Sequence, residues 1–311
     1  MKNFLASPLE GIITPMITPL LDDNHLDFEG LKKLTNHLIT GGVHGIFILG
    51  TTGECTNISY AVRSRLIRET CLKVDGAVPV LVGISDTSME ESISLAKIAH
   101  QAGAQAVVAA PPYYFGLGEA ELLDYYKKLA EALPLPLFLY NMPSHTKTML
   151  SQKVVVELSK HPNIIGLKDS SGNAVYFNSM VYAFRNQPDF SLLVGPEEMM
   201  VAAVLMGGHG GVSGGSNMFP KLYVDLYQAT RSGDLQQMAQ LQEMVMEISS
   251  ELYALGTYGS SYLKGLKAAL SILEISNGYL ATPMSAFEEE ILVLIREKLT
   301  KLQAYHNYRT K

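Results

Sequence analysis

A lysine ends one of the most apolar segments of the chain. Lys168 follows residues 164–167 (Ile-Ile-Gly-Leu) and precedes the polar turn 169–172 (Asp-Ser-Ser-Gly). A segment this hydrophobic is expected to be buried, and a buried ammonium group is costly unless it is paired or has lost its proton. A neutral lysine amine attacks carbonyl carbons, which is the chemistry of Schiff-base enzymes. Lys168 is therefore a candidate nucleophile, although a lysine at a strand end can also extend its charged group into solvent.

Eight short apolar or β-branched runs along the chain predict strands. They cover residues 11–15, 44–49, 79–84, 106–110, 136–140, 164–168, 191–195 and 210–213. Most of them begin roughly 20 to 35 residues apart, which is the spacing of βα units. Segments with helical periodicity lie between them. For example, Asp27 can cap a helix in which Leu31, Leu34 and Leu38 share one face.

These strands are apolar throughout instead of alternating, which favours an α/β fold with a closed parallel (β/α)8 TIM barrel. A doubly wound open sheet is the alternative. That fold usually places a glycine-rich phosphate loop after the first strand, and residues 14–19 contain no glycine. After about residue 217 the pattern is helical only, over residues 221–231, 234–255, 261–273 and 285–302. We predict a barrel over residues 1–225 and a C-terminal helical region over residues 226–311 that packs on it.

The active site of such a barrel lies at the carboxyl ends of its strands. Those ends supply residues 50–54 (Gly-Thr-Thr-Gly-Glu), 111–114 (Pro-Pro-Tyr-Tyr), 140–144 (Tyr-Asn-Met-Pro-Ser), 168–170 (Lys-Asp-Ser), 195–198 (Gly-Pro-Glu-Glu) and 211–215 (Gly-Val-Ser-Gly-Gly). Each has a plainer explanation as well, because tyrosines often pack in cores and glycines often serve tight turns.

Composition and charge exclude several classes of protein. The chain has 47% hydrophobic and 17% charged residues, as soluble globular proteins do. A net charge of −6 without a Lys/Arg block argues against a nucleic-acid partner, and no apolar stretch is long enough to span a membrane. The N-terminus has no apolar core of a secretory signal, so we expect a cytoplasmic protein. Cys55, Cys71 and the histidines lack metal-ligand spacing, which predicts no metal.

Three of these segments together resemble a known family. The GTTGE loop (50–54), the YN-x-P-S segment (140–144) and the strand IIGLKDSSG (164–172) occur in the order and spacing of the dihydrodipicolinate synthase / N-acetylneuraminate lyase family of pyruvate-dependent class I aldolases. The resemblance extends from about residue 11 to the C-terminal helices, nearly the whole chain. It implies a TIM barrel that uses no cofactor and binds pyruvate covalently as a substrate.

The resemblance implies a role for each matching residue. Lys168 corresponds to the lysine whose amine condenses with the keto carbon of pyruvate, and Tyr140 to the tyrosine that shuttles protons during the reaction. Thr51 corresponds to the hydroxyl that links this tyrosine to a second one, Tyr114. In the family that second tyrosine enters the site of the neighbouring subunit, so a homodimer or homotetramer is implied.

The resemblance also implies how pyruvate is held. The backbone amides of Thr51 and Thr52 correspond to the cradle of the pyruvate carboxylate, a role that suits a glycine-flanked loop with free N–H groups. Val212 corresponds to a position whose backbone carbonyl borders the site. The implied substrates are pyruvate and an aldehyde.

Two positions distinguish the synthases of this family from its sialic-acid lyases, and at each of them this chain has a different residue. The synthases carry an arginine after YN-x-P-S to bind the carboxylate of aspartate semialdehyde. Here that residue is His145, which cannot provide the charged bidentate fork of arginine, although the nearby Lys147 could compensate. The sialic-acid lyases use a serine to bind their sugar chain where this chain has Gly214.

An acidic pair favours a substrate derived from a sugar acid. Glu197 and Glu198 resemble the carboxylates with which the lyases bind sugar hydroxyls, and Glu198 is our substrate-binding candidate. We therefore expect an aldolase or lyase that joins or releases pyruvate and an aldehyde, with a sugar-acid-derived aldehyde as one candidate. The alternatives are a genuine 4-hydroxy-tetrahydrodipicolinate synthase, a dehydratase of 2-keto-3-deoxy sugar acids, and a catalytically silent binding or regulatory barrel.

Overall fold

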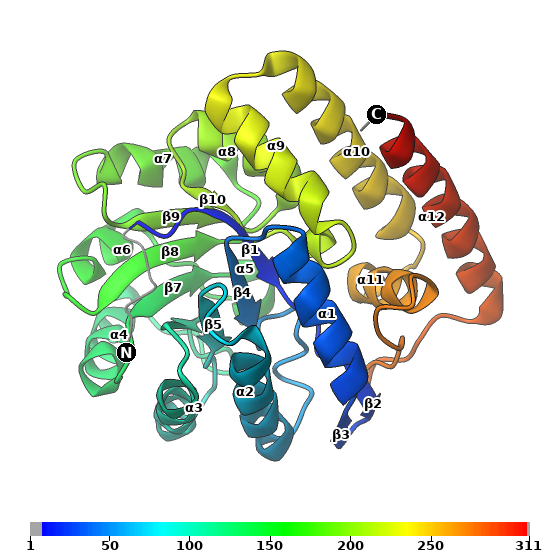
Figure 1. Cartoon of the computed structure of the whole chain (residues 1–311). Helices are drawn as coiled ribbons and strands as arrows, with labels where there is room; N and C mark the ends of the chain where they lie inside the picture. The colour runs from blue at the N-terminus through cyan, green and yellow to red at the C-terminus, as the bar shows by residue number, and fades with distance from the viewer. Residues whose placement is uncertain (1–7, 310–311) are drawn as a thin grey trace.

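The chain folds into a closed barrel of eight parallel strands (Figure 1), as predicted. The computed structural model describes residues 8–309. In barrel order the strands are β1 (Gly11–Pro15), β10 (Gly210–Gly211), β9 (Ser191–Val194), β8 (Ile164–Asp169), β7 (Leu137–Asn141), β6 (Ala106–Ala109), β5 (Val80–Gly83) and β4 (Gly45–Ile48). Each predicted strand is present, with ends shifted by no more than two residues.

Burial on both faces explains why the strands are apolar without alternation. One set of side chains fills the barrel interior, and among these Ile13, Phe47, Phe138 and Leu193 are almost completely buried. The opposite faces of the same strands pack against the surrounding helices in a larger hydrophobic core. A parallel sheet covered in this way has no polar face.

Helices and short turns follow the strands, and the longer helices form the outer ring. They are α1 (Phe28–Thr40), α2 (Tyr60–Val74), α3 (Met89–Ala102), α4 (Glu119–Ala132), α5 (Pro143–Thr146), α6 (Gln152–Leu158), α7 (Ala174–Phe184), α8 (Met200–Leu205) and α9 (Pro220–Ser232), with 3-10 turns η1 (Glu197–Met199) and η2 (Gly214–Asn217). The predicted cap at Asp27 is present, because its side chain accepts a hydrogen bond from the Gly30 amide at 2.8 Å. Leu31, Leu34 and Leu38 are fully buried on one face of α1.

A small antiparallel hairpin was not predicted from the sequence. It consists of β2 (Leu20–Asp22) and β3 (His25–Leu26), between β1 and α1. The Asp22 carboxylate accepts from the Asn24 amide and contacts the His25 ring, so short polar contacts hold the turn. Strands of two or three residues are too short to show a periodic pattern.

Three further helices complete the C-terminal region. They are α10 (Leu235–Leu252), α11 (Ser261–Ile272) and α12 (Glu289–Arg309), drawn from yellow to red along one side of the barrel in Figure 1. α10 packs on α9 and α12, and α11 packs on η2 beside the barrel mouth. The division at residues 225 and 226 stays a prediction, and both residues lie within α9. No helix among residues 8–309 is long and apolar enough to cross a membrane.

Candidate active site

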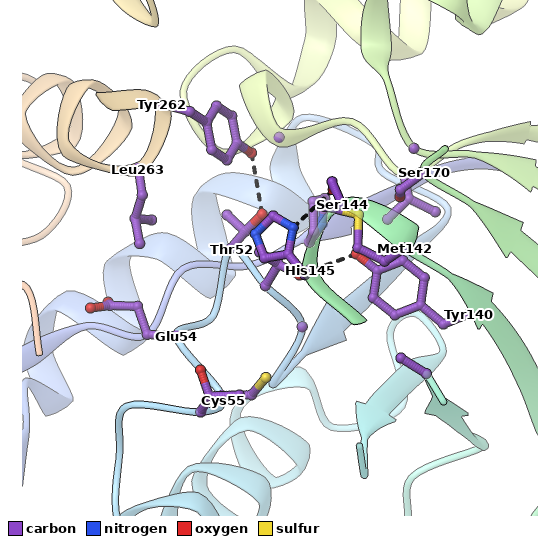
Figure 2. A pocket seen from close by; sticks show the side chains of 18 of the residues that line it. Thr52, Glu54, Cys55, Tyr140, Met142, Ser144, His145, Ser170, Tyr262 and Leu263 are labelled. Carbon is purple, nitrogen blue, oxygen red and sulfur yellow. Dashed lines mark hydrogen bonds between the residues drawn. The ribbon is translucent and has the colours of Figure 1, made fainter. Parts of the chain in front are cut away.

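A cavity of about 700 Å³ opens at the carboxyl ends of the barrel strands. It brings together seven of the eight residues that the sequence predicted for the site, namely Thr51, Thr52, Tyr140, His145, Lys168, Glu198 and Val212. Figure 2 shows several of them around the cavity, with contributions from elements far apart in the sequence. The position agrees with the location of active sites in TIM barrels.

Lys168 is buried, with only 6% of its surface exposed, and its amine faces aromatic rings. Its Nζ atom lies 4.1 Å from the centroid of the Tyr140 ring and 4.8 Å from that of Phe47. The parallel register places Tyr140 beside Lys168 on the neighbouring strands β7 and β8. A lysine amine in contact with a phenol ring at the floor of a cavity is well placed to meet a carbonyl substrate.

The hydroxyls of Thr51 and Tyr140 form a hydrogen bond with 3.2 Å between the oxygens. Tyr140 is 5% exposed, whereas Thr51 is half-buried on the loop that follows β4. The pair that sequence analysis placed in one relay is therefore in contact across 89 residues of sequence. A threonine hydroxyl can both accept a proton from the phenol and donate one to it.

Tyr114 lies outside the cavity of its own chain. Its side chain is 80% exposed, and its ring packs edge-on against Phe115 at a centroid distance of 5.2 Å. The preceding residue, Tyr113, lines the cavity instead. The predicted role of Tyr114 in a neighbouring subunit stays a prediction.

A buried ion pair fixes the loop that carries Thr51 and Thr52. Glu54 contacts the ammonium group of Lys267 on α11, and both side chains are fully buried. Lys267 also donates to the carbonyl oxygen of Tyr279 at 2.7 Å, and the Glu54 carboxylate accepts from the Ala281 amide at 2.7 Å. Burial lowers the pKa of Lys267, and the Glu54 carboxylate opposes that shift. The loop is thereby tied to the C-terminal helical region.

The two adjacent glutamates are already engaged in hydrogen bonds within the protein. Glu197 accepts from the Gly215 amide at 2.7 Å and from the hydroxyls of Tyr223 at 2.7 Å and Tyr253 at 3.0 Å. Glu198 accepts from the hydroxyl of Ser249. Burial raises the pKa of Glu197 to about 7, despite the opposing effect of these donors. A binding role for Glu198 stays a prediction, although the residue lines the cavity.

His145 lies on α5 at the rim of the cavity, beside the hydroxyl of Ser144. Its Nδ1 atom is 3.0 Å from the Ser144 oxygen, a contact drawn in Figure 2. Lys147 donates to the Ser144 carbonyl at 2.7 Å. Burial, together with the charge of Lys147, lowers the pKa of His145, so the imidazole is neutral at pH 7. A neutral imidazole cannot replace the charge of an arginine.

Two tyrosines from the C-terminal helices complete the cavity wall, and sequence analysis did not predict them. Tyr253 follows α10, and Tyr262 lies in the first turn of α11. The Tyr262 hydroxyl is 3.2 Å from the Oγ1 atom of Thr52 (Figure 2). The strand-end rule could not identify them, because both residues follow the last barrel strand. Among residues 8–309, no group of three or more His, Cys, Asp or Glu is placed to hold a metal ion.

The protein is thus a parallel (β/α)8 barrel with lysine and tyrosine at the carboxyl ends of adjacent strands, and comparison with known proteins identifies its family. Residues 8–302 match the dihydrodipicolinate synthetase family, and the chain belongs to it. It is an enzyme of the lyase class, like the aldolases and synthases among its relatives.

Three relatives illustrate the range of this family. The structure of dihydrodipicolinate synthase from Bacteroides thetaiotaomicron is similar with a TM-score of 0.93 at 53% identity, over 95% of this chain and 99% of that one. The Escherichia coli protein named "probable 2-dehydro-3-deoxy-D-pentonate aldolase YjhH" is 35% identical over 85% of this chain and 86% of its own length. The structure of E. coli YagE in complex with pyruvate has a TM-score of 0.89 at 31% identity, over 94% of this chain and 98% of that one.

Proposed function

We propose that the protein is a pyruvate-dependent aldolase in which Lys168 forms a Schiff base with pyruvate. The observation that carries the proposal is the contact of the buried Lys168 amine with Tyr140 at the floor of the cavity, with Thr51 hydrogen-bonded to that tyrosine. The pyruvate complex of the related YagE supports pyruvate as the first substrate. The catalytically silent alternative has no support in this geometry, because the lysine, the tyrosine and the threonine are all retained and assembled.

The proposed reaction begins when the Lys168 amine attacks the keto carbon of pyruvate. The resulting carbinolamine loses water, with Tyr140 donating a proton to the departing hydroxyl and Thr51 relaying protons to and from the phenol. Loss of a proton from the pyruvate methyl carbon gives an enamine. That carbon then adds to the aldehyde carbonyl, whose oxygen takes up a proton. Hydrolysis finally returns the free amine and the product.

We propose that the loop of residues 50–54, which the Glu54–Lys267 pair holds in place, binds the carboxylate of pyruvate. We assign this role to the backbone amides of Thr51 and Thr52, and the Val212 carbonyl to the border of the site. Support comes from the position of all three residues on the cavity wall. Binding a carboxylate with backbone N–H groups requires a rigid loop, because mobile donors lose entropy on binding.

For the second substrate we propose a hydroxylated aldehyde derived from a sugar acid. His145 provides no permanent positive charge, whereas the outer cavity wall carries Glu198, Tyr253 and Tyr262, which offer hydrogen bonds to hydroxyl groups. The naming of YjhH as a pentonate aldolase is consistent with this chemistry. Incubation with 2-keto-3-deoxy sugar acids and detection of released pyruvate tests the assignment. Turnover only with pyruvate and aspartate semialdehyde would contradict it.

A synthase activity is the second candidate function. It is favoured by the 53% identity to the B. thetaiotaomicron protein described as dihydrodipicolinate synthase. In that case Lys147, which lies beside His145, would have to supply the charge for the second carboxylate. A dehydratase of 2-keto-3-deoxy sugar acids would use the same Lys168 and Tyr140, and would release water without cleaving a carbon–carbon bond.

Assembly belongs to the proposal as well. We infer at least a homodimer, in which the exposed Tyr114 extends the relay of Thr51 and Tyr140 in the neighbouring subunit. The exposure of the Tyr114 and Phe115 rings, 80% and 75%, supports a partner surface at this loop. The cytoplasmic location stays a prediction from the sequence.

A further inference from the structure

We propose that the hydroxyl of Tyr262 binds a hydroxyl group of the aldehyde substrate, which makes Tyr262 a specificity-determining residue. This inference rests on the proposed aldolase function and names a residue that selects its second substrate. Tyr262 belongs to α11, outside the barrel, and its side chain reaches the cavity between Thr52 and Gly214. Figure 2 shows the phenol entering from the helix side above Thr52.

Gly214 leaves the space that the phenol uses. A β-carbon at residue 214 would lie 1.7 Å from the Tyr262 hydroxyl oxygen and 2.7 Å from the ring carbon that bears it. A side chain at residue 214 would overlap the Tyr262 phenol. The phenol can take its observed position because residue 214 is glycine. The Tyr262 hydroxyl therefore lies where a side chain of residue 214 would begin.

The Tyr262 hydroxyl has hydrogen-bonding capacity to spare on this wall. The carboxylate of Glu197 already accepts three hydrogen bonds, and the Tyr253 hydroxyl is one of the donors. Glu198 accepts from Ser249. A phenol can donate one hydrogen bond and accept two, and the contact with Thr52 uses only one of these.

The charge around Tyr262 favours a neutral partner. Burial raises the pKa of the Tyr262 phenol, with a further contribution from the Glu197 charge, so the group stays protonated. This part of the wall has two adjacent carboxyl groups, Glu197 and Glu198, and among residues 8–309 no Lys or Arg side chain from it lines the cavity, so it offers no cation to a second carboxylate. A neutral phenol next to acidic groups therefore suits the hydroxyl of a polyhydroxylated aldehyde better than the carboxylate of aspartate semialdehyde.

The test compares two aldehydes that differ in hydroxyl groups. Addition of pyruvate to glyceraldehyde and to propanal is measured for the wild type and for Tyr262→Phe, which keeps the ring and its edge-on packing against Tyr253. We expect the ratio of kcat/KM for glyceraldehyde over propanal to fall about 10-fold, which is the value of one good hydrogen bond. Tyr258→Phe is the matched control, since that tyrosine is 78% exposed nearby, and it should leave the ratio unchanged.

Two further readouts separate this inference from the function on which it rests. Borohydride trapping of pyruvate and the KM for pyruvate should be the same in Tyr262→Phe and in the wild type. An unchanged aldehyde ratio overturns the inference and leaves the aldolase assignment standing. Equal losses with both aldehydes and a raised KM for pyruvate also overturn it, because Tyr262 would then act only by positioning Thr52. Failure of the wild type to trap pyruvate removes the proposed function, and this inference with it.

Discussion

Replacement of Lys267 by methionine tests how the loop of residues 50–57 is held in place. Methionine has a similar length and no charge, so the variant removes the ammonium group with little change in volume. It leaves the Glu54 carboxylate with the Ala281 amide as its remaining hydrogen-bond donor, and it removes the donor to the Tyr279 carbonyl. The expected effect is large because both side chains of the pair are 0% exposed.

The magnitude follows from burial. Breaking a buried ion pair by removal of one partner costs about 3–5 kcal/mol, because the remaining charge is left without compensation. A loss of that size lowers the melting temperature by roughly 5–15 °C in a protein of this size. The pair between Lys128 and Asp124 is the matched contrast, because both side chains are 62% exposed. Exposed pairs contribute little, and Lys128→Met should leave the melting temperature unchanged.

The assay is thermal unfolding followed by circular dichroism for the wild type, Lys267→Met, Lys128→Met and the double variant Glu54→Gln/Lys267→Met. The double variant removes the orphaned charge and should recover part of the loss. A Lys267→Met protein that melts within about 2 °C of the wild type, corresponding to roughly 1 kcal/mol, would contradict the expected cost of breaking this buried pair.

Three further predictions concern the site and its neighbours. Thr51→Val removes the hydroxyl partner of Tyr140 at nearly constant shape, and kcat should fall about 10- to 100-fold while pyruvate is still trapped. Burial raises the pKa of Glu197 from 4.5 to about 7. The protonated carboxyl therefore stabilises the folded protein fully below pH 4.5, and this contribution is lost as the pH rises through 7. The stability of Glu197→Gln relative to the wild type should therefore increase by about 3 kcal/mol between pH 4.5 and 8, measured by urea unfolding, and a flat difference would contradict this. Burial raises the pKa of Cys55 and raises that of Cys71 to about 12, so iodoacetamide at pH 7 should label both thiols much more slowly than free cysteine.

Much of the fold could be predicted because local patterns encode it. Apolar residues recur every three to four positions in the helix with Leu31, Leu34 and Leu38. The strands are continuous apolar runs at the spacing of βα units. Burial on both strand faces in the structure is the physical cause of that pattern. The hairpin of β2 and β3 was missed because two or three residues carry no measurable period.

The candidate site also has residues that could be predicted from the sequence and residues that could not. Lys168, Tyr140 and Thr51 could be predicted because strand ends in a barrel converge on one face. Tyr262 could not, because its contact with Thr52 joins residues 210 positions apart and depends on how α11 packs on the barrel. The same holds for the burial of the Glu54–Lys267 pair. Such contacts depend on tertiary packing, which no local pattern of residue types records.

Formation of a Schiff base between Lys168 and pyruvate is the step on which the proposed function depends. The most direct test is reduction with borohydride in the presence of pyruvate, followed by intact mass measurement and peptide mapping. We expect one reduced pyruvyl group on Lys168 and none in Lys168→Ala, with that variant shown to be folded by circular dichroism. An adduct on a different lysine, or no adduct in folded wild-type protein, would contradict it.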